Sequence, residues 1–120
     1  MSAMTEYRVR RVSDLAVIDL QGQLDALAGV ALDRAYTQIG QEVKTILLNF
    51  GDVDLINSTG IAALIGLILQ ATKAGRRLLA CCLSDHYTKI FQVARLSDYI
   101  GLFPDEATAL AGRQESDFQL

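Results

Sequence analysis

The sequence predicts one α/β domain built on a small, mostly parallel sheet. Two β-type segments open the chain, and short apolar segments then alternate with segments of helical length. At 120 residues the chain has room for one hydrophobic core, and its 51% hydrophobic and 21% charged residues are typical of a folded domain. We expect this domain to cover residues 1–112 and a polar, flexible tail to cover residues 113–120.

An antiparallel hairpin is expected at the N-terminal edge of the sheet. Residues 7–12 alternate between apolar and polar, residues 15–20 are largely apolar, and Ser13-Asp14 between them is typical of a tight turn. Gly22 should end the second strand, and Asp25 should cap the helix that follows.

The rest of the chain predicts parallel strands joined by helical crossovers. Further strands are expected over residues 44–50, 77–82 and 99–102, with a loop over residues 51–57. About four helices should cover the sheet, over residues 26–41, from residue 59 or 60 to residue 74, and over residues 85–94 and 104–111. Strands separated by helices of this length pair in parallel through right-handed crossovers.

Composition excludes several classes of function. A net charge of −3 gives no electrostatic case for nucleic acid, and the two short basic clusters, residues 8–11 and 73–77, lie near acidic residues and indicate a solvated surface. The longest apolar run, residues 61–69, is too short to span a bilayer, and residues 1–11 lack the apolar core of a signal peptide, so we expect a cytoplasmic protein without membrane insertion. Cys81 and Cys82 should point to opposite faces of a strand as core residues, and with His86 as the one histidine we expect no metal site and no cofactor.

The most informative segment runs from Asn49 to Ile61. A buried strand ends there, a loop carries Asp52 and Asp54, and Ser58-Thr59-Gly60 opens a helix. A serine at this position can cap the helix, and the same helix start also favours a phosphate group. From spacing alone, both interpretations of Ser58 stay open. Asp52 and Asp54 could suggest a response-regulator acceptor site, but the further acidic pair and the lysine that such a site needs cannot be assembled from the sequence. We find no set of catalytic residues, and so we do not expect an enzyme.

These residues resemble the STAS family, the fold of bacterial anti-sigma factor antagonists. Residues 46–50 match the family's strand, Ile56-Asn57-Ser58-Thr59-Gly60-Ile61 matches its Asp-Ser-Ser/Thr-Gly-Leu/Ile motif, and Gly22-Gln23-Leu24-Asp25 resembles its Gly-Glu-Leu-Asp element. The resemblance extends over residues 9–110, and it implies a STAS-like fold.

The resemblance also implies a mechanism of partner switching. Ser58 would accept phosphate from an anti-sigma factor that is also a serine kinase of the histidine-kinase-like ATPase fold. The unmodified protein would sequester that kinase, phosphorylation would release it, and a PP2C-type phosphatase would reset the cycle. The residues expected to contact the partner surround the acceptor: Asp25, Asn57, Thr59, Gly60 and Ile61.

One residue departs from the family's pattern. Asn57 replaces the usual acidic residue before the serine, and an amide cannot act as a base. This change leaves an alternative open, in which the protein is a constitutive STAS adaptor subunit of a lipid-trafficking ABC transporter complex and Ser58 is only a helix cap.

Overall fold

A computed structural model describes residues 5–118, and it describes side chains over residues 5–112. Its five-stranded sheet consists of β1 (Glu6–Val12), β2 (Leu15–Leu24), β3 (Thr45–Ile56), β4 (Arg77–Cys81) and β5 (Ile100–Phe103), which pair in sequence order. β1 is antiparallel to β2, and the other neighbouring strands are parallel. The predicted mixed sheet with an antiparallel edge hairpin is confirmed.

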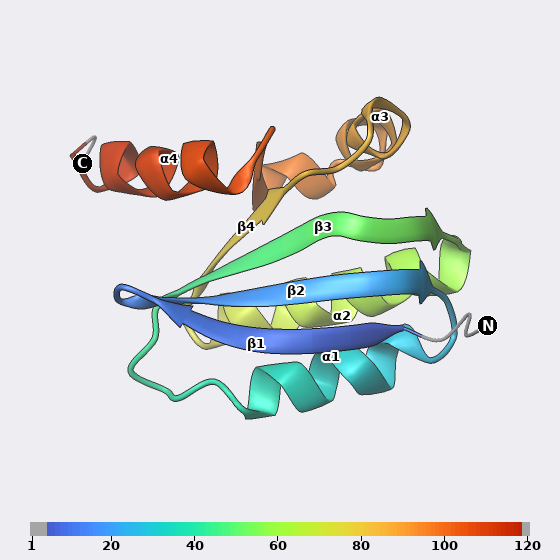
Figure 1. Cartoon of the computed structure of the whole chain (residues 1–120), viewed down its shortest axis with the longest axis horizontal. Coiled ribbons are helices and arrows are strands. Elements are labelled where there is room, and N and C mark those ends of the chain that lie inside the picture. Colours follow the sequence, from blue (N-terminus) through green and yellow to red (C-terminus); the bar gives the residue numbers. More distant parts are fainter. Residues whose placement is uncertain (1–4, 119–120) are drawn as a thin grey trace.

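The helices divide unequally between the two faces of the sheet. They are α1 (Ala28–Thr37), α2 (Ser58–Lys73), α3 (Asp85–Val93) and α4 (Glu106–Phe118), with a short 3₁₀ helix, η1 (Leu96–Asp98), before β5. Because β2 to β5 pair in sequence order, crossovers of one hand place α1, α2 and α3 on the same face. Figure 1 shows α1 and α2 running along the strands, with α4 on the other side of β4.

The larger core lies between the sheet and the first three helices. Side chains that alternate along the strands point into it, together with one face of α1, one face of α2 and Phe91 of α3. A smaller cluster on the opposite face joins the alternate strand residues, such as Val17 and Leu47, to Ala109 of α4. The second face is therefore only partly covered by apolar side chains.

β2 and β3 both extend beyond their predicted ends. Gly22 does not end β2. It has a φ of 90° and lies between two shifts in the pairing of β2 with β3, and the strand continues past them to Leu24. β3 continues alongside to Ile56, so the loop predicted over residues 51–57 is wrong. The added length carries both strands to the corner where α2 begins.

Several helix boundaries also differ from the prediction. α1 begins at Ala28, and Asp25 is not its cap, because the Asp25 carboxylate instead accepts the backbone N–H of Leu27 at 3.0 Å in the turn before the helix. α4 begins after Pro104 and extends to Phe118, beyond the predicted end at residue 111. Flexibility of residues 113–120 stays a prediction, since the side chains of 113–118 and all of residues 119–120 lie outside the described part.

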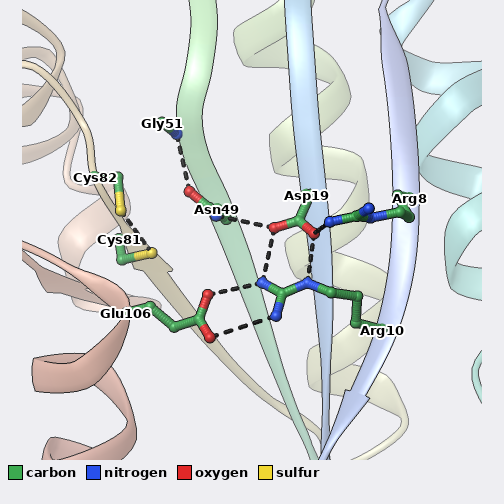
Figure 2. Close-up of polar contacts among 8 residues, drawn as sticks. All are labelled: Arg8, Arg10, Asp19, Asn49, Gly51, Cys81, Cys82 and Glu106. Carbon is green, nitrogen blue, oxygen red and sulfur yellow. Dashed lines mark hydrogen bonds and ion pairs between the residues drawn. The ribbon is translucent and has the colours of Figure 1, made fainter.

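The exposed part of the second face carries a cluster of charged and polar side chains (Figure 2). Arg10 of β1 makes a bidentate contact with Asp19 of β2, with its Nε 2.5 Å from Oδ2 and its Nη2 2.9 Å from Oδ1. The same guanidinium donates to Glu106 of α4 at 2.7 Å, and Asn49 of β3 donates to Asp19 at 2.9 Å. Arg10 thereby fastens α4 to the sheet where apolar contact is small.

Asp19 is the carboxylate at the centre of this cluster. The hydrogen bonds from Arg10 lower the pKa of Asp19, assisted by the amide of Asn49, against the opposing effect of partial burial. A pKa lowered in the folded state stabilises the fold above the unfolded value of about 4, and this contribution is lost as the pH falls below it.

No helix within residues 5–118 is both long enough and apolar enough to cross a membrane.

We predict that Asp19→Asn lowers the free energy of unfolding by about 1–2 kcal/mol at pH 7, because the charge-assisted bonds to Arg10 are lost. The difference from the wild type should shrink as the pH falls from about 5 to about 2, where Asp19 becomes protonated in both states. Urea unfolding at several pH values measures this. Asp52 is exposed on β3, and Asp52→Asn is the matched control, which should change the free energy of unfolding by less than about 0.5 kcal/mol. A difference for Asp19→Asn that is independent of pH would contradict this role.

Candidate functional site

The candidate site lies where β2 and β3 end side by side and α2 begins. Leu24 and Ile56 are register partners at these ends, and the backbone N–H of Asn57 donates to the Leu24 carbonyl oxygen at 3.1 Å. In Figure 1 this corner is at the right of the view, beyond the arrowheads of β2 and β3. We call residues 24–27 and 55–61 the Ser58 corner.

Asn57, rather than Ser58, caps α2. Its backbone is extended (φ −97°, ψ −176°), and its Oδ1 accepts the N–H of Gly60 at 3.0 Å. The same oxygen accepts the Thr59 hydroxyl at 2.6 Å. The interpretation of Ser58 as the helix cap, which the sequence left open, is therefore wrong, because Asn57 caps α2 and Ser58 is its first helical residue.

Ser58 is exposed at this first helical position. Among the residues that the structure describes, no side chain or backbone group hydrogen-bonds its hydroxyl, whereas the hydroxyl of neighbouring Thr59 is held by Asn57. The N–H groups of a first helical turn and the positive end of the helix dipole favour an anion there. The first turn of α2 carries no acidic residue that would oppose one.

Gly60 brings α2 into direct contact with the end of β2. It is buried, and a Cβ at this position would collide with the carbonyl group and Cβ of Leu24. That carbonyl oxygen also accepts the N–H of Asn57, so α2 can begin here only with a residue that has no side chain at position 60. The requirement for Gly60 is thus steric.

The other two residues expected at the site are positioned differently. Asp25 is half-buried and lies in the turn directly after Leu24, so the structure brings it to the same corner as Asn57. Ile61 is also half-buried, but its side chain packs against the larger core. Ile61 can therefore offer a partner only part of its surface.

Sequence reasoning missed two residues of this corner and one residue of α3 that contacts it. Leu27, in the turn after β2, and Leu55, near the end of β3, are large apolar side chains that stay 48% and 44% exposed. Tyr87 of α3 accepts the N–H of Ile56 through its hydroxyl at 3.0 Å, which fixes the residue before the α2 cap. The prediction of a loop over residues 51–57 concealed Leu55, and the contact of Tyr87 with Ile56 joins residues far apart in the sequence, which local patterns do not indicate.

No metal centre competes for this location. Within the described residues, no group of three or more His, Cys, Asp or Glu side chains could hold a metal ion. Asp52 and Asp54 are exposed along β3 rather than gathered at a strand end.

Comparison with known proteins identifies the family. The model of the STAS domain matches residues 6–109. The chain belongs to the STAS-domain family. The matched range includes residues 56–61, the segment that opens α2.

Solved structures show the same STAS fold. An anti-sigma factor antagonist from Mycobacterium paratuberculosis superimposes with a TM-score of 0.78 at 15% identity, over 93% of this chain and 96% of that one. The phosphorylated form of the Bacillus cell fate determinant SpoIIAA matches with a TM-score of 0.62 at 23% identity, over 86% and 96% of the two chains. A sulfate transporter family protein from Wolinella succinogenes matches with a TM-score of 0.75 at 21% identity, over 86% and 87%.

We predict that Asn57→Ala lowers the free energy of unfolding by about 1 kcal/mol, because the N–H of Gly60 loses its cap. Ser58→Ala should change it by less than about 0.5 kcal/mol, since no protein hydrogen bond of the described residues is lost. Asn57→Asp keeps a capping oxygen beside the positive helix end and should be at least as stable as the wild type. Urea unfolding of the three variants measures the differences, and a larger loss for Ser58→Ala than for Asn57→Ala would reverse the assignment.

Proposed function

We propose that this STAS domain is an anti-sigma factor antagonist-type binding module that switches partners through phosphorylation of Ser58. The unmodified protein sequesters an anti-sigma factor that is also a serine kinase of the histidine-kinase-like ATPase fold. Phosphorylation releases that kinase, and a PP2C-type phosphatase removes the phosphate. The module binds and is modified in the cytoplasm, where ATP is available, and catalyses no reaction itself.

The observation that carries the proposal is the state of the two adjacent hydroxyls. Thr59 uses its hydroxyl to support Asn57, whereas Ser58 is exposed, with no hydrogen-bond partner for its hydroxyl among the described residues. Ser58 is therefore the hydroxyl that a kinase can reach without breaking the α2 cap. The helix start also favours the phosphate once it is attached.

The charge of one phosphate is large enough to change the partner. Phosphorylation adds about −1.5 to −2 charges. Beside a partner carboxylate ~6 Å away at an effective dielectric of ~20, each unit of charge costs roughly 3 kcal/mol. Because ~1.4 kcal/mol changes affinity tenfold, one phosphate weakens binding about 100-fold or more. A repulsion of this size needs no change in the fold.

Asn57 suits this role although it is not acidic. Its amide oxygen is occupied by Gly60 and Thr59, and an amide cannot remove the proton from Ser58. We therefore expect the kinase to supply the base. The neutral residue also removes one source of repulsion next to phosphoserine.

The surroundings of Ser58 fit a protein partner. Leu27 and Leu55 expose apolar surface at the corner, which a partner would bury near the acceptor. Asp25 adds a carboxylate at the same corner, within reach of polar contacts from the partner.

The constitutive adaptor is the less well supported alternative. It requires Ser58 to be only a helix cap, and Asn57 has that role instead. A sulfate transporter family protein shares the fold at 21% identity, which is similar to the identity of the anti-sigma factor antagonists, so identity does not separate the two functions. The adaptor hypothesis therefore depends on the partner that the protein is found to bind.

We predict that the purified protein gains one phosphate when it is incubated with its ATP-dependent kinase, and that Ser58→Ala gains none. Thr59→Ala is the matched control and should still be phosphorylated, because its hydroxyl serves only to support Asn57. Intact-mass analysis counts the phosphates, and fragment spectra locate them. The phosphorylated protein should bind the kinase about 100-fold more weakly in calorimetry.

The kinase can be obtained by affinity capture from the source cells with the unmodified protein as bait. Recovery of an ABC-type ATPase in its place would support the adaptor. An active kinase that leaves the wild type unphosphorylated, or phosphorylates Ser58→Ala equally, would contradict the proposed switch.

A further inference from the structure

Two adjacent cysteines bring their sulfur atoms into contact on the second face of the sheet. Neighbouring residues within a strand point to opposite faces, which is the arrangement expected from the sequence. However, β4 ends at Cys81, and Cys82 takes a left-handed backbone conformation with a φ of 71°. This turn directs the Cys82 side chain back, and its thiol donates to the Cys81 sulfur at 3.0 Å (Figure 2).

The two thiols differ in their accessibility. Both are free, but Cys81 is fully buried in the smaller cluster with Val17 and Leu79, whereas Cys82 is half-buried at its edge. Cys82 also lines a cavity of about 200 Å³ between the end of β3 and the start of α3, together with Phe50 and Tyr87. A small reagent can therefore approach Cys82 but not Cys81.

We propose that Cys81 and Cys82 form a reversible redox-modification site, in which a low-molecular-weight disulfide oxidises the pair to a vicinal disulfide. The proposal rests on the contact between the two sulfurs and on the access to one of them. It is independent of the function proposed for Ser58.

The reaction is two thiol–disulfide exchanges. The Cys82 thiolate attacks one sulfur of the small disulfide, forms a mixed disulfide and releases one small thiol. The Cys81 thiolate then attacks the Cys82 sulfur, forms the Cys81–Cys82 bond and releases the second small thiol. Two cysteine thiols are oxidised, one disulfide is reduced to two thiols, and the two thiol protons pass to the released thiols through water.

The order of attack follows from the environment of each sulfur. Burial raises the pKa of the Cys81 thiol, as does the Cys82 thiol beside it, and Glu106 and Asp105 act in the same direction. Cys81 is therefore a poor first nucleophile and is shielded from reagents. Once Cys82 is modified, the proximity of the two sulfurs compensates for this low reactivity.

The product should be easy to reduce. The Cα atoms of consecutive residues are about 3.8 Å apart, which is shorter than the ~4.4–6.8 Å that ordinary disulfides span. A strained disulfide has a more oxidising potential and is opened readily by thiols. The pair is thus suited to reversible modification rather than to permanent stabilisation of the fold.

The test treats the folded, reduced protein with glutathione disulfide and follows its intact mass. We expect a monomer that has lost two hydrogen atoms, with the disulfide mapped to the Cys81-Cys82 dipeptide. Low concentrations of dithiothreitol should restore both thiols, as counted by alkylation. The glutathione adduct on Cys82 should disappear at least about tenfold faster in the wild type than in Cys81→Ala, because only the wild type has the second thiol.

Cys82→Ala is the matched control and should stay largely unmodified, because its remaining thiol is buried. Circular dichroism verifies that both variants are folded. If a variant is not folded, the intact mass of the wild type still shows whether the Cys81–Cys82 disulfide forms. A wild-type adduct as persistent as that of Cys81→Ala would overturn the proposal. Disulfide-linked dimers in place of the internal bond, or no reaction at all, would also overturn it.

Discussion

The carbonyl group of Leu24 is the contact on which the Ser58 corner depends. Its oxygen accepts the N–H of Asn57, and its surface fills the space where Gly60 would otherwise carry a side chain. One backbone group therefore joins the end of β2 to both the cap and the first turn of α2. Asn57 also stabilises the first turn, because its side-chain oxygen accepts hydrogen bonds from the N–H of Gly60 and the hydroxyl of Thr59. The Ser58 side chain lies beside these residues but takes no part in their hydrogen bonds, and so its hydroxyl is free of them.

The sheet topology explains why the start of α2 packs on the larger core while the opposite face carries the polar cluster. Strands that pair in sequence order place α1, α2 and α3 on one face, where the larger core anchors the start of α2. The other face is left to α4, and the bonds from Arg10 to Asp19 and Glu106 fasten that helix. The two cysteines lie at the edge of this second face, away from the main core. The proposed switch at Ser58 and the proposed redox site at Cys82 thus lie in different parts of the same small domain.

Local signals in the sequence were sufficient for much of the fold. Ser13 takes a positive φ in the predicted hairpin turn, Gly75 stops α2 in the left-handed region, and Ser84 caps α3 as its residue type favours. The errors arose where long-range pairing decides the conformation. Gly22 resembles a strand breaker, yet the paired β3 holds it in a bulge, and the same pairing extends β3 through residues that resemble a loop. The position of Ser58 at the start of a helix was predictable. Which of Asn57 and Ser58 caps that helix was not, because Asn and Ser are equally good caps.

The requirement for contact between Leu24 and Gly60 can be measured with a pair of glycine variants in the same helix. Gly60→Ala introduces a methyl group against the Leu24 carbonyl, whereas Gly66→Ala introduces one where no atom lies within 4 Å. Urea unfolding should show that Gly60→Ala loses about 1–3 kcal/mol of stability through overpacking. Gly66→Ala should gain roughly 0.5–1 kcal/mol from helix propensity. Equal effects of the two substitutions, or a gain for Gly60→Ala, would contradict the claim that this contact positions the Ser58 corner.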